Sequence, residues 1–174
     1  MVGFEWELPT KIIFGEGCLT HLGTETKRWG RKVLFVYGHG LFKTGVEGAS
    51  VPNHMLEHPL SGLYDLPHGA GLSIIIPAWL KYHKQKLVHR LVKFGKGVFD
   101  LPDLSEDLAS AEKVIGFLVA WYRKIGTPTT LQEANLQKID VEACTAQALE
   151  LCRLWGIGGY TEEDIRSIYH LTEG

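Results

Sequence analysis

From residue 50 onward, hydrophobic and polar residues alternate with the spacing of amphipathic helices. In one segment, Val114, Phe117, Leu118 and Trp121 lie three or four residues apart, so we expect them to form one buried stripe. Similar spacings recur in the neighbouring segments, with polar residues between them. The pattern predicts a helix that ends near residue 65, followed by helices over about 70–82, 85–99, 105–126, 140–155 and 161–171.

The expected ends of these helices follow from capping residues. Ser105 and Asp140 are good N-caps, and Thr161 with Asp164 has the spacing of a capping box. Pro77 falls inside the apolar segment that begins near residue 70. Because proline lacks an N–H group and crowds the preceding turn, we expect it to kink or interrupt that helix.

The first 48 residues have a different pattern. Residues 8–17 and 32–37 are rich in β-branched and aromatic residues and predict two strands, with a short helix over 19–29 between them. The second run leads into Gly38 and Gly40, and a strand followed by Gly-Xaa-Gly is how a dinucleotide-binding fold begins. Two strands do not make a complete domain of that kind. Gly38 and Gly40 are nevertheless the candidates for cofactor binding.

Composition narrows the class of protein. The chain has 174 residues, of which 45% are hydrophobic and 22% charged, and its formal net charge is -2. This balance gives no electrostatic case for binding nucleic acid or an anionic membrane. The longest apolar run, residues 72–80, is too short to span a bilayer. Cys18, Cys144 and Cys152 show no Cys-Xaa2-Cys spacing, which favours reduced cysteines and a cytoplasmic location.

Three of the eight histidines fall between residues 54 and 68. His54 and His58 are four residues apart and therefore project from the same face of a helix. Pro67 should keep that helix from continuing, which places His68 at the start of the next one. A chain that folds back here brings the three imidazoles together as metal ligands or as a ligand and a base. The alternative at this spacing is that the histidines lie at the surface or in the core and have no metal-binding or catalytic role.

The histidine segment also carries a resemblance. Residues 54–72 read His-Met-Leu-Glu-His-Pro-Leu-Ser-Gly-Leu-Tyr-Asp-Leu-Pro-His-Gly-Ala-Gly-Leu. This run resembles the signature of the iron-containing alcohol dehydrogenases, and in particular of their butanol dehydrogenase branch. Residues 9–15 and 32–38 resemble the opening strands of that family. The long middle of the family's sequence is absent here, with the join near residues 45–52.

The resemblance implies a mainly α fold. We expect a helical bundle similar to the C-terminal metal-binding domain of the iron-containing alcohol dehydrogenases, with a small N-terminal β element of two strands and a short helix. Residues 1–48 would be the remnant of the α/β nucleotide-binding domain, and residues 49–174 the helical domain.

The resemblance also implies a chemistry. In the family, one aspartate and three histidines hold a divalent iron or zinc, and NAD or NADP accepts a hydride from an alcohol. His54 and His68 match two of the histidine ligands, and His58 matches a histidine beside the nicotinamide ring. The remaining ligands should come from an Asp-Xaa3-His pair, which this sequence does not contain. Recruitment of His58 as a third ligand, with Asp65 as a fourth donor, is the alternative.

Three functions follow from these observations. The first is a truncated relative of a metal- and NAD(P)-dependent alcohol or aldehyde oxidoreductase that is inactive or weakly active alone. The second is a non-catalytic metal-binding domain, and the third a structural helical domain. Loss of half of a two-domain enzyme should expose apolar surface, for which Trp6, Phe14, Phe35 and residues 72–80 are candidates. We therefore expect a homo-oligomer, most simply a dimer.

Overall fold

The computed structural model describes residues 18–27 and 52–173. The first of these ranges contains a 3-10 turn, η1 (Cys18–His21), and a short helix, α1 (Leu22–Lys27), where a helix was predicted. The predicted strands over 8–17 and 32–37 lie outside the described residues. Gly38, Gly40 and the expected domain boundary after residue 48 also lie outside them, so the two-domain division stays a prediction.

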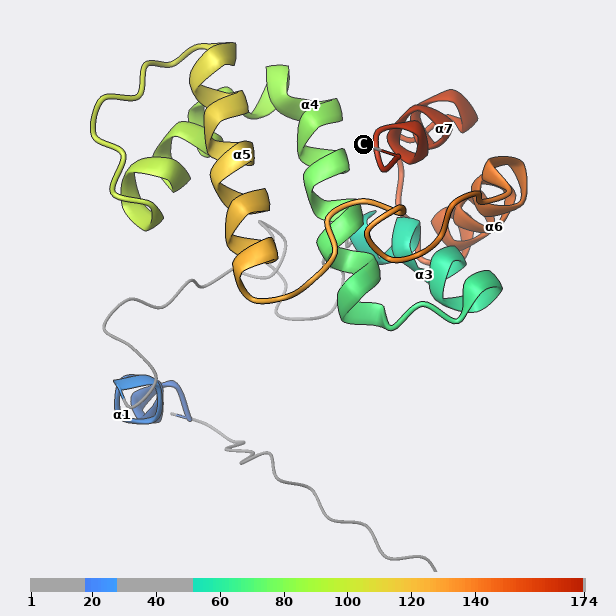
Figure 1. Cartoon of the computed structure of the whole chain (residues 1–174), viewed down its shortest axis with the longest axis horizontal. Helices are drawn as coiled ribbons and strands as arrows, with labels where there is room; N and C mark the ends of the chain where they lie inside the picture. Colours follow the sequence, from blue (N-terminus) through green and yellow to red (C-terminus); the bar gives the residue numbers. More distant parts are fainter. Residues whose placement is uncertain (1–17, 28–51, 174) are drawn as a thin grey trace, which may run out of the picture. The chain divides into compact units, whose positions relative to one another are not determined.

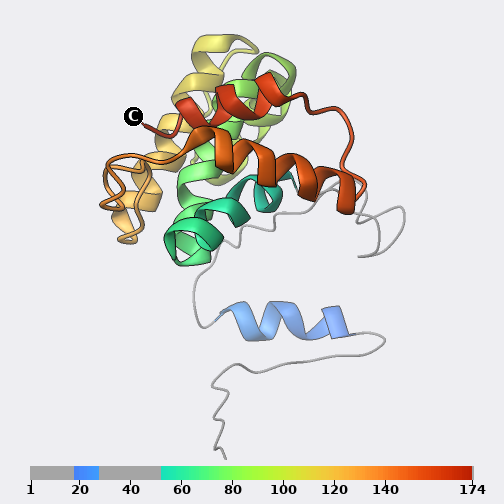
Figure 2. The same ribbon diagram turned by 90° about the vertical axis from the view of Figure 1, so that its right-hand side faces the viewer.

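The second range folds into five helices (Figures 1 and 2). They are α3 (Pro52–Tyr64), α4 (His68–Val98), α5 (Leu108–Lys124), α6 (Val141–Leu154) and α7 (Glu162–His170). Helix α4 contacts α3, α5 and α7, while α6 packs between α3 and α7. The predicted mainly helical fold is confirmed for these residues.

Helix α4 runs through Pro77 without a break, so the predicted interruption there does not occur. The separate helices predicted over 70–82 and 85–99 are also wrong, because both ranges belong to α4. A proline inside a helix costs about 3 kcal/mol or more through the lost hydrogen bond and the crowded carbonyl. Pro77 is buried, and Ile74, Ile75 and Ala78 around it are buried in the core. Burial of these apolar side chains offsets the cost, because each fully buried large side chain contributes roughly 1.5–3 kcal/mol. Residues 72–80 are therefore largely core, and their predicted exposure is also wrong.

Two clusters of buried side chains lie along α4. The cluster at its N-terminal half joins α3, α6 and α7, and the cluster at its C-terminal half joins α5. In α5, Val114 and Leu118 are buried as predicted, but Phe117 and Trp121 are 40% and 43% exposed, so their predicted burial is wrong. Among the described helices, α5 makes its main contact with α4, and the exposure of Phe117 and Trp121 shows that the buried face of α5 is narrower than predicted.

The helix ends follow the predicted chemistry except in α5. Its N-cap is Asp107, whose Oδ1 accepts a hydrogen bond from the Ser110 N–H at 2.7 Å. Ser105, the predicted cap, lies two residues earlier, and its own N–H donates to Ser110 Oγ. The predicted caps of α6 and α7, Asp140 and Thr161, are confirmed.

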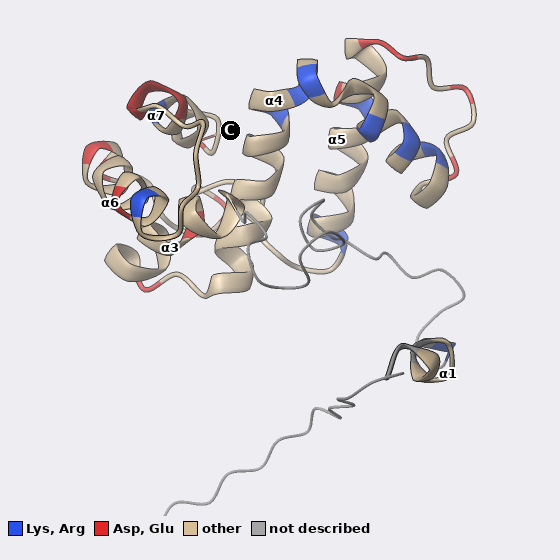
Figure 3. Ribbon diagram, turned by 180° about the vertical axis from the view of Figure 1, so that it is seen from behind, with Lys and Arg blue, Asp and Glu red and all other residues tan. Residues whose placement is uncertain are grey.

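Charge is unevenly distributed over the helices (Figure 3). Lysine and arginine gather on the second half of α4, and acidic residues follow in the loop to α5. Lys84 Nζ lies 2.6 Å from Glu112 Oε2, and His89 Nδ1 lies 2.8 Å from Glu106 Oε1. Both pairs are at the surface, where an ion pair contributes about 0–1 kcal/mol. Within the described ranges, no helix combines the length and apolar character that a membrane span requires.

Gly95 permits the close packing of α4 on α5. A Cβ atom at this position would lie 2.4 Å from Val114 Cγ2 and 2.6 Å from Leu104 Cδ1. We expect Gly95→Ala to lower the free energy of unfolding by about 1–3 kcal/mol, because an overpacked core must shift. Gly97→Ala is the matched control: its Cβ meets nothing within 4 Å, so the gain in helix propensity should raise stability by about 0.5–1 kcal/mol. Urea unfolding measures both, and equal effects of the two substitutions would contradict this account.

Asp164 completes the capping box of α7, and its contribution to the free energy of unfolding depends on pH. Hydrogen bonds from the Thr161 hydroxyl, the Tyr82 hydroxyl and the Thr161 N–H lower the pKa of Asp164 from 3.8 to about 2. Because the pKa is depressed in the folded state, the stabilisation is complete above 3.8 and is lost as the pH falls through about 2. We expect Asp164→Asn to lower the free energy of unfolding by about 0.5–2 kcal/mol at pH 7.

The deficit of Asp164→Asn should shrink as urea unfolding is repeated from pH 5 down to pH 2. Glu163→Gln is the control, because this carboxylate pairs only with Arg166 at the exposed helix start and should change stability by less than about 0.5 kcal/mol. A deficit that is the same at pH 2 as at pH 7 would refute the assignment.

Candidate metal centre

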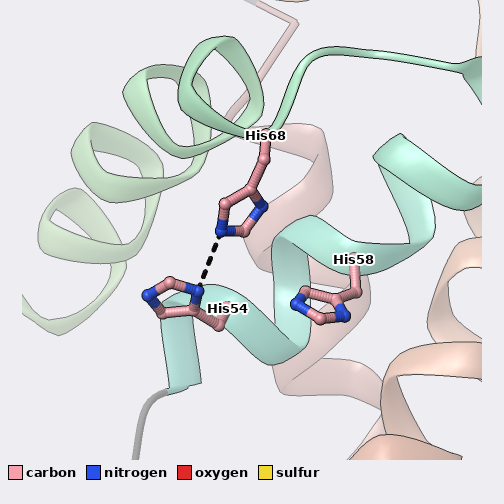
Figure 4. Close-up of side chains that lie close together, drawn as sticks. All are labelled: His54, His58 and His68. Atoms are coloured by element: carbon pink, nitrogen blue, oxygen red, sulfur yellow. Dashed lines mark hydrogen bonds between the residues drawn. The ribbon is translucent and has the colours of Figure 1, made fainter. Parts of the chain in front are cut away.

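Three histidines from two helices meet at the junction of α3 and α4 (Figure 4). His54 and His58 lie one turn apart on α3, and His68 is the first residue of α4. His68 Nε2 lies 3.0 Å from His54 Nδ1. One ring nitrogen from each of the three histidines falls within a group whose members are at most 4.8 Å apart. The three imidazoles therefore lie close together, as predicted.

A tight reversal between the helices produces this arrangement. Helix α3 ends at Tyr64, and Asp65 adopts the left-handed conformation with φ of 53°. Leu66 is buried in the core, and its carbonyl oxygen lies 2.9 Å from Ser61 Oγ. Pro67 then precedes α4 with φ of -55° and extended ψ. The anchored leucine and the proline together return the chain so that His68 faces α3.

The histidine cluster opens to solvent on one side. His58 and His68 are exposed, and His54 is half-buried. The ring of Trp155, at the end of α6, meets the His58 ring edge-on with centroids 5.0 Å apart. A small ligand can therefore reach the histidines directly, while Trp155 limits the ring orientations available to His58.

Glu57 is the residue of this site that sequence reasoning missed. It lies between the two α3 histidines in sequence, yet its side chain is fully buried. Its Oε2 contacts His68 Nδ1, and its Oε1 accepts a hydrogen bond from Ser61 Oγ at 2.5 Å. A glutamate beside histidines is ordinarily a solvated helix residue, so the only available signal was its place within a segment rich in apolar residues.

Burial lowers the pKa of His54, and the positive charges that His68 and His58 can carry lower it further. The sign follows from desolvation, which disfavours the protonated imidazole, and from repulsion between like charges. The lowered pKa of His54 favours its neutral form. A neutral imidazole has the free nitrogen lone pair that a metal ion requires.

The nitrogen atoms fit a transition-metal ion. With bonds of about 2.0–2.1 Å from zinc to histidine nitrogen, two ligand nitrogens lie about 3.0 Å apart at a right angle and about 3.4 Å apart at the tetrahedral angle. The His54–His68 separation of 3.0 Å agrees with this range. His58 completes a group of three donors and needs a change in side-chain position to approach as closely. Asp65 is exposed and is not part of the group found.

Residues 46–172 match the family model described as the C-terminal part of the Fe-containing alcohol dehydrogenases. The match covers more than half of the chain. It contains all three histidines and Glu57.

Individual relatives agree with this match. The chain is 30% identical to NADH-dependent butanol dehydrogenase A of Clostridium acetobutylicum over 97 residues, which are 55% of this chain and 25% of that protein. It is also 25% identical to probable NADH-dependent butanol dehydrogenase 1 of Bacillus subtilis over 131 residues. These residues make up 75% of this chain and 34% of that protein. The chain thus spans between a quarter and about a third of the length of these relatives.

The crystal structure of NADH-dependent butanol dehydrogenase A from Thermotoga maritima has the same fold over the matched part. The superposition has a TM-score of 0.67 at 30% identity and covers 78% of this chain and 36% of that chain. Sequence and structure therefore agree: this chain belongs to the Fe-containing alcohol dehydrogenase family.

Proposed function

We propose that this chain supplies the metal-binding helical part of an NAD(P)-dependent alcohol or aldehyde oxidoreductase, with His54 and His68 as metal ligands. The observation that carries the proposal is the 3.0 Å approach of His68 Nε2 to His54 Nδ1, at a surface open to small molecules. The names of the two relatives, NADH-dependent butanol dehydrogenases, support a nicotinamide cofactor and an alcohol as the class of substrate.

A divalent iron or zinc held here supplies Lewis-acid polarisation of an alcohol or carbonyl oxygen. The protein residues have separate tasks. His54 and His68 bind the ion, and His58 stands beside them on the exposed side, where an alcohol and a nicotinamide ring would approach. Trp155 restrains the His58 ring against the end of α6. Gly38 and Gly40 are the proposed contacts for the cofactor.

The metal can be held by two histidines of this chain or by three. Two histidines seldom hold iron or zinc tightly, because catalytic zinc sites normally have three protein ligands. The sequence contains no Asp-Xaa3-His pair, and His58 is the further donor that belongs to the histidine group in the described part of the chain. We propose that His58 becomes the third ligand when no other donor is supplied.

A non-catalytic metal-binding or structural domain is the second candidate function. It is favoured by the printed sequence, which contains no Asp-Xaa3-His pair to complete the ligand set implied by the family. In this case metal binds at the histidines, or does not bind at all, and no nicotinamide cofactor is used.

The proposal also includes the cellular location and the oligomeric state of the protein. Cys144 and Cys152 are buried and unpaired, and burial raises the pKa of Cys144 to about 11, which leaves its thiol unreactive. These reduced cysteines favour the cytoplasm. The homodimer stays a prediction, because the expected interface residues are either buried in α4 or lie outside the described residues.

The decisive experiment is metal analysis of untagged protein beside the variant in which His54, His58 and His68 are all changed to alanine. We expect close to one iron or zinc ion per chain in the wild type and none in the variant. A variant with alanine at the exposed His89 and His170 is the control and should keep its metal.

The single variant His58→Ala separates the two ligand sets. Loss of metal from it shows three-histidine binding, and retention shows that His58 is not a ligand. A wild type without metal, or a triple variant that keeps it, contradicts the proposed function. Metal-loaded protein is then assayed for alcohol oxidation with NAD and with NADP, and absence of activity with either favours the non-catalytic candidate.

A further inference from the structure

We propose that Glu57 is a positioning residue that holds His68 as the tautomer protonated on Nδ1, so that His68 Nε2 presents its lone pair to the metal position. The inference rests on the proposed function, because it concerns the delivery of one ligand atom. Glu57 itself does not touch the metal in this role; it acts through His68.

The burial of Glu57 gives the first argument. A carboxylate removed from water destabilises the fold unless hydrogen bonds and charges compensate it. Glu57 is 0% exposed, and each of its oxygens has one partner, Oε2 with His68 Nδ1 and Oε1 with Ser61 Oγ. Because both oxygens are engaged, the carboxylate has one rotational setting. That setting places an acceptor at His68 Nδ1.

The surroundings of Glu57 give the second argument. A Cβ atom on Gly71 would lie 2.3 Å from Glu57 Oε1 and 2.6 Å from its Cγ. Only glycine at position 71 therefore leaves room for the carboxylate in its present place. Gly71 N–H donates to the carbonyl of Pro67, which ties this opening to the turn that carries His68.

The third argument is the direction of the imidazole. A neutral histidine has one N–H and one lone pair, and the partner of one nitrogen decides which atom carries the proton. With Nδ1 donating to Glu57, the lone pair lies on Nε2. That atom lies 3.0 Å from His54 Nδ1, which places the lone pair at the position proposed for the metal. Ligand histidines commonly donate their second ring N–H to a carboxylate in this way.

A second histidine–glutamate pair lies at the surface and serves as a comparison. His89 Nδ1 and Glu106 Oε1 are 2.8 Å apart, but the two side chains are 73% and 63% exposed. Water competes for both groups there, so Glu106 has no means of fixing the tautomer of His89. The chain thus contains a matched control for the contact between the buried Glu57 and His68.

The test uses the full chain with Glu57→Met, which removes the acceptor without opening a large cavity, and Glu106→Met as its control. Long-range proton–nitrogen NMR of the metal-free protein, at a pH where the imidazoles are neutral, reports the tautomer of His68. Zinc affinity is measured by competition with a chromophoric chelator, and thermal unfolding of the metal-free proteins reports stability.

We expect wild-type His68 to be protonated on Nδ1 and Glu57→Met to lose this preference. Zinc should bind about 10–100-fold more weakly to Glu57→Met. Glu106→Met should bind zinc within about twofold of the wild type, since its carboxylate faces water. If Glu57→Met does not fold, the wild-type tautomer decides alone: protonation of His68 on Nε2 overturns the proposal.

Zinc binding that is unchanged in a folded Glu57→Met overturns the role of Glu57 and leaves the proposed function standing. Weaker binding with an unchanged tautomer also overturns it, because the loss then has another cause. A wild-type chain that binds no zinc overturns the proposed function and, with it, the presentation of a ligand by Glu57.

Discussion

The contact between the buried carboxylate of Glu57 and His68 constrains the junction of α3 and α4. An unpaired charge in this position would destabilise the fold by several kcal/mol, so the folded chain must bring His68 and Ser61 to it. Both partners depend on the turn after α3: Ser61 Oγ also lies 2.9 Å from the carbonyl oxygen of Leu66, and His68 begins α4. The same contacts that satisfy the carboxylate therefore fix the relative position of the two helices that carry the histidines.

Helix α4 connects this junction to the other described helices through its packing contacts. Its first turns contact α3 and the cluster that includes α6 and α7, and its later turns pack against α5. Continuity through Pro77 is necessary for this role, because a break there would separate the two clusters of buried side chains. The Ser73 hydroxyl, one turn before the proline, shares its single proton between the carbonyls of Ala70 and Pro128, which joins α4 to the segment after α5.

The sequence predicted best those features that depend on neighbouring residues. The caps Asp140 and Thr161 and the end of α3 before Pro67 are local chemistry, and each is present. The three histidines also came from spacing together with a turn signal. Their resemblance to a known family then supplied roles that spacing alone left open.

The features that were missed depend on which side of a helix meets a neighbour. Pro77 is tolerated because of side chains that pack around it, and Phe117 is exposed because α4 covers only part of α5. Glu57 is the clearest case, since its burial requires His68, Ser61 and the vacant space beside Gly71 at once. The helical period of α3 can assign only Ser61 to it, four residues further on, because His68 and Gly71 belong to the next helix.

The histidine centre is built almost entirely from one short segment. His54, Glu57, Ser61, His68 and Gly71 lie within 18 consecutive positions, and the described contact from outside this segment is the ring of Trp155 on His58. A site of this kind forms when α3, the turn and α4 fold against α6 and α7. Its geometry does not require a nucleotide-binding domain, although hydride transfer to a nicotinamide does. The helical part can therefore retain the arrangement of the histidines, and with it the proposed metal position, independently of whether a cofactor is bound.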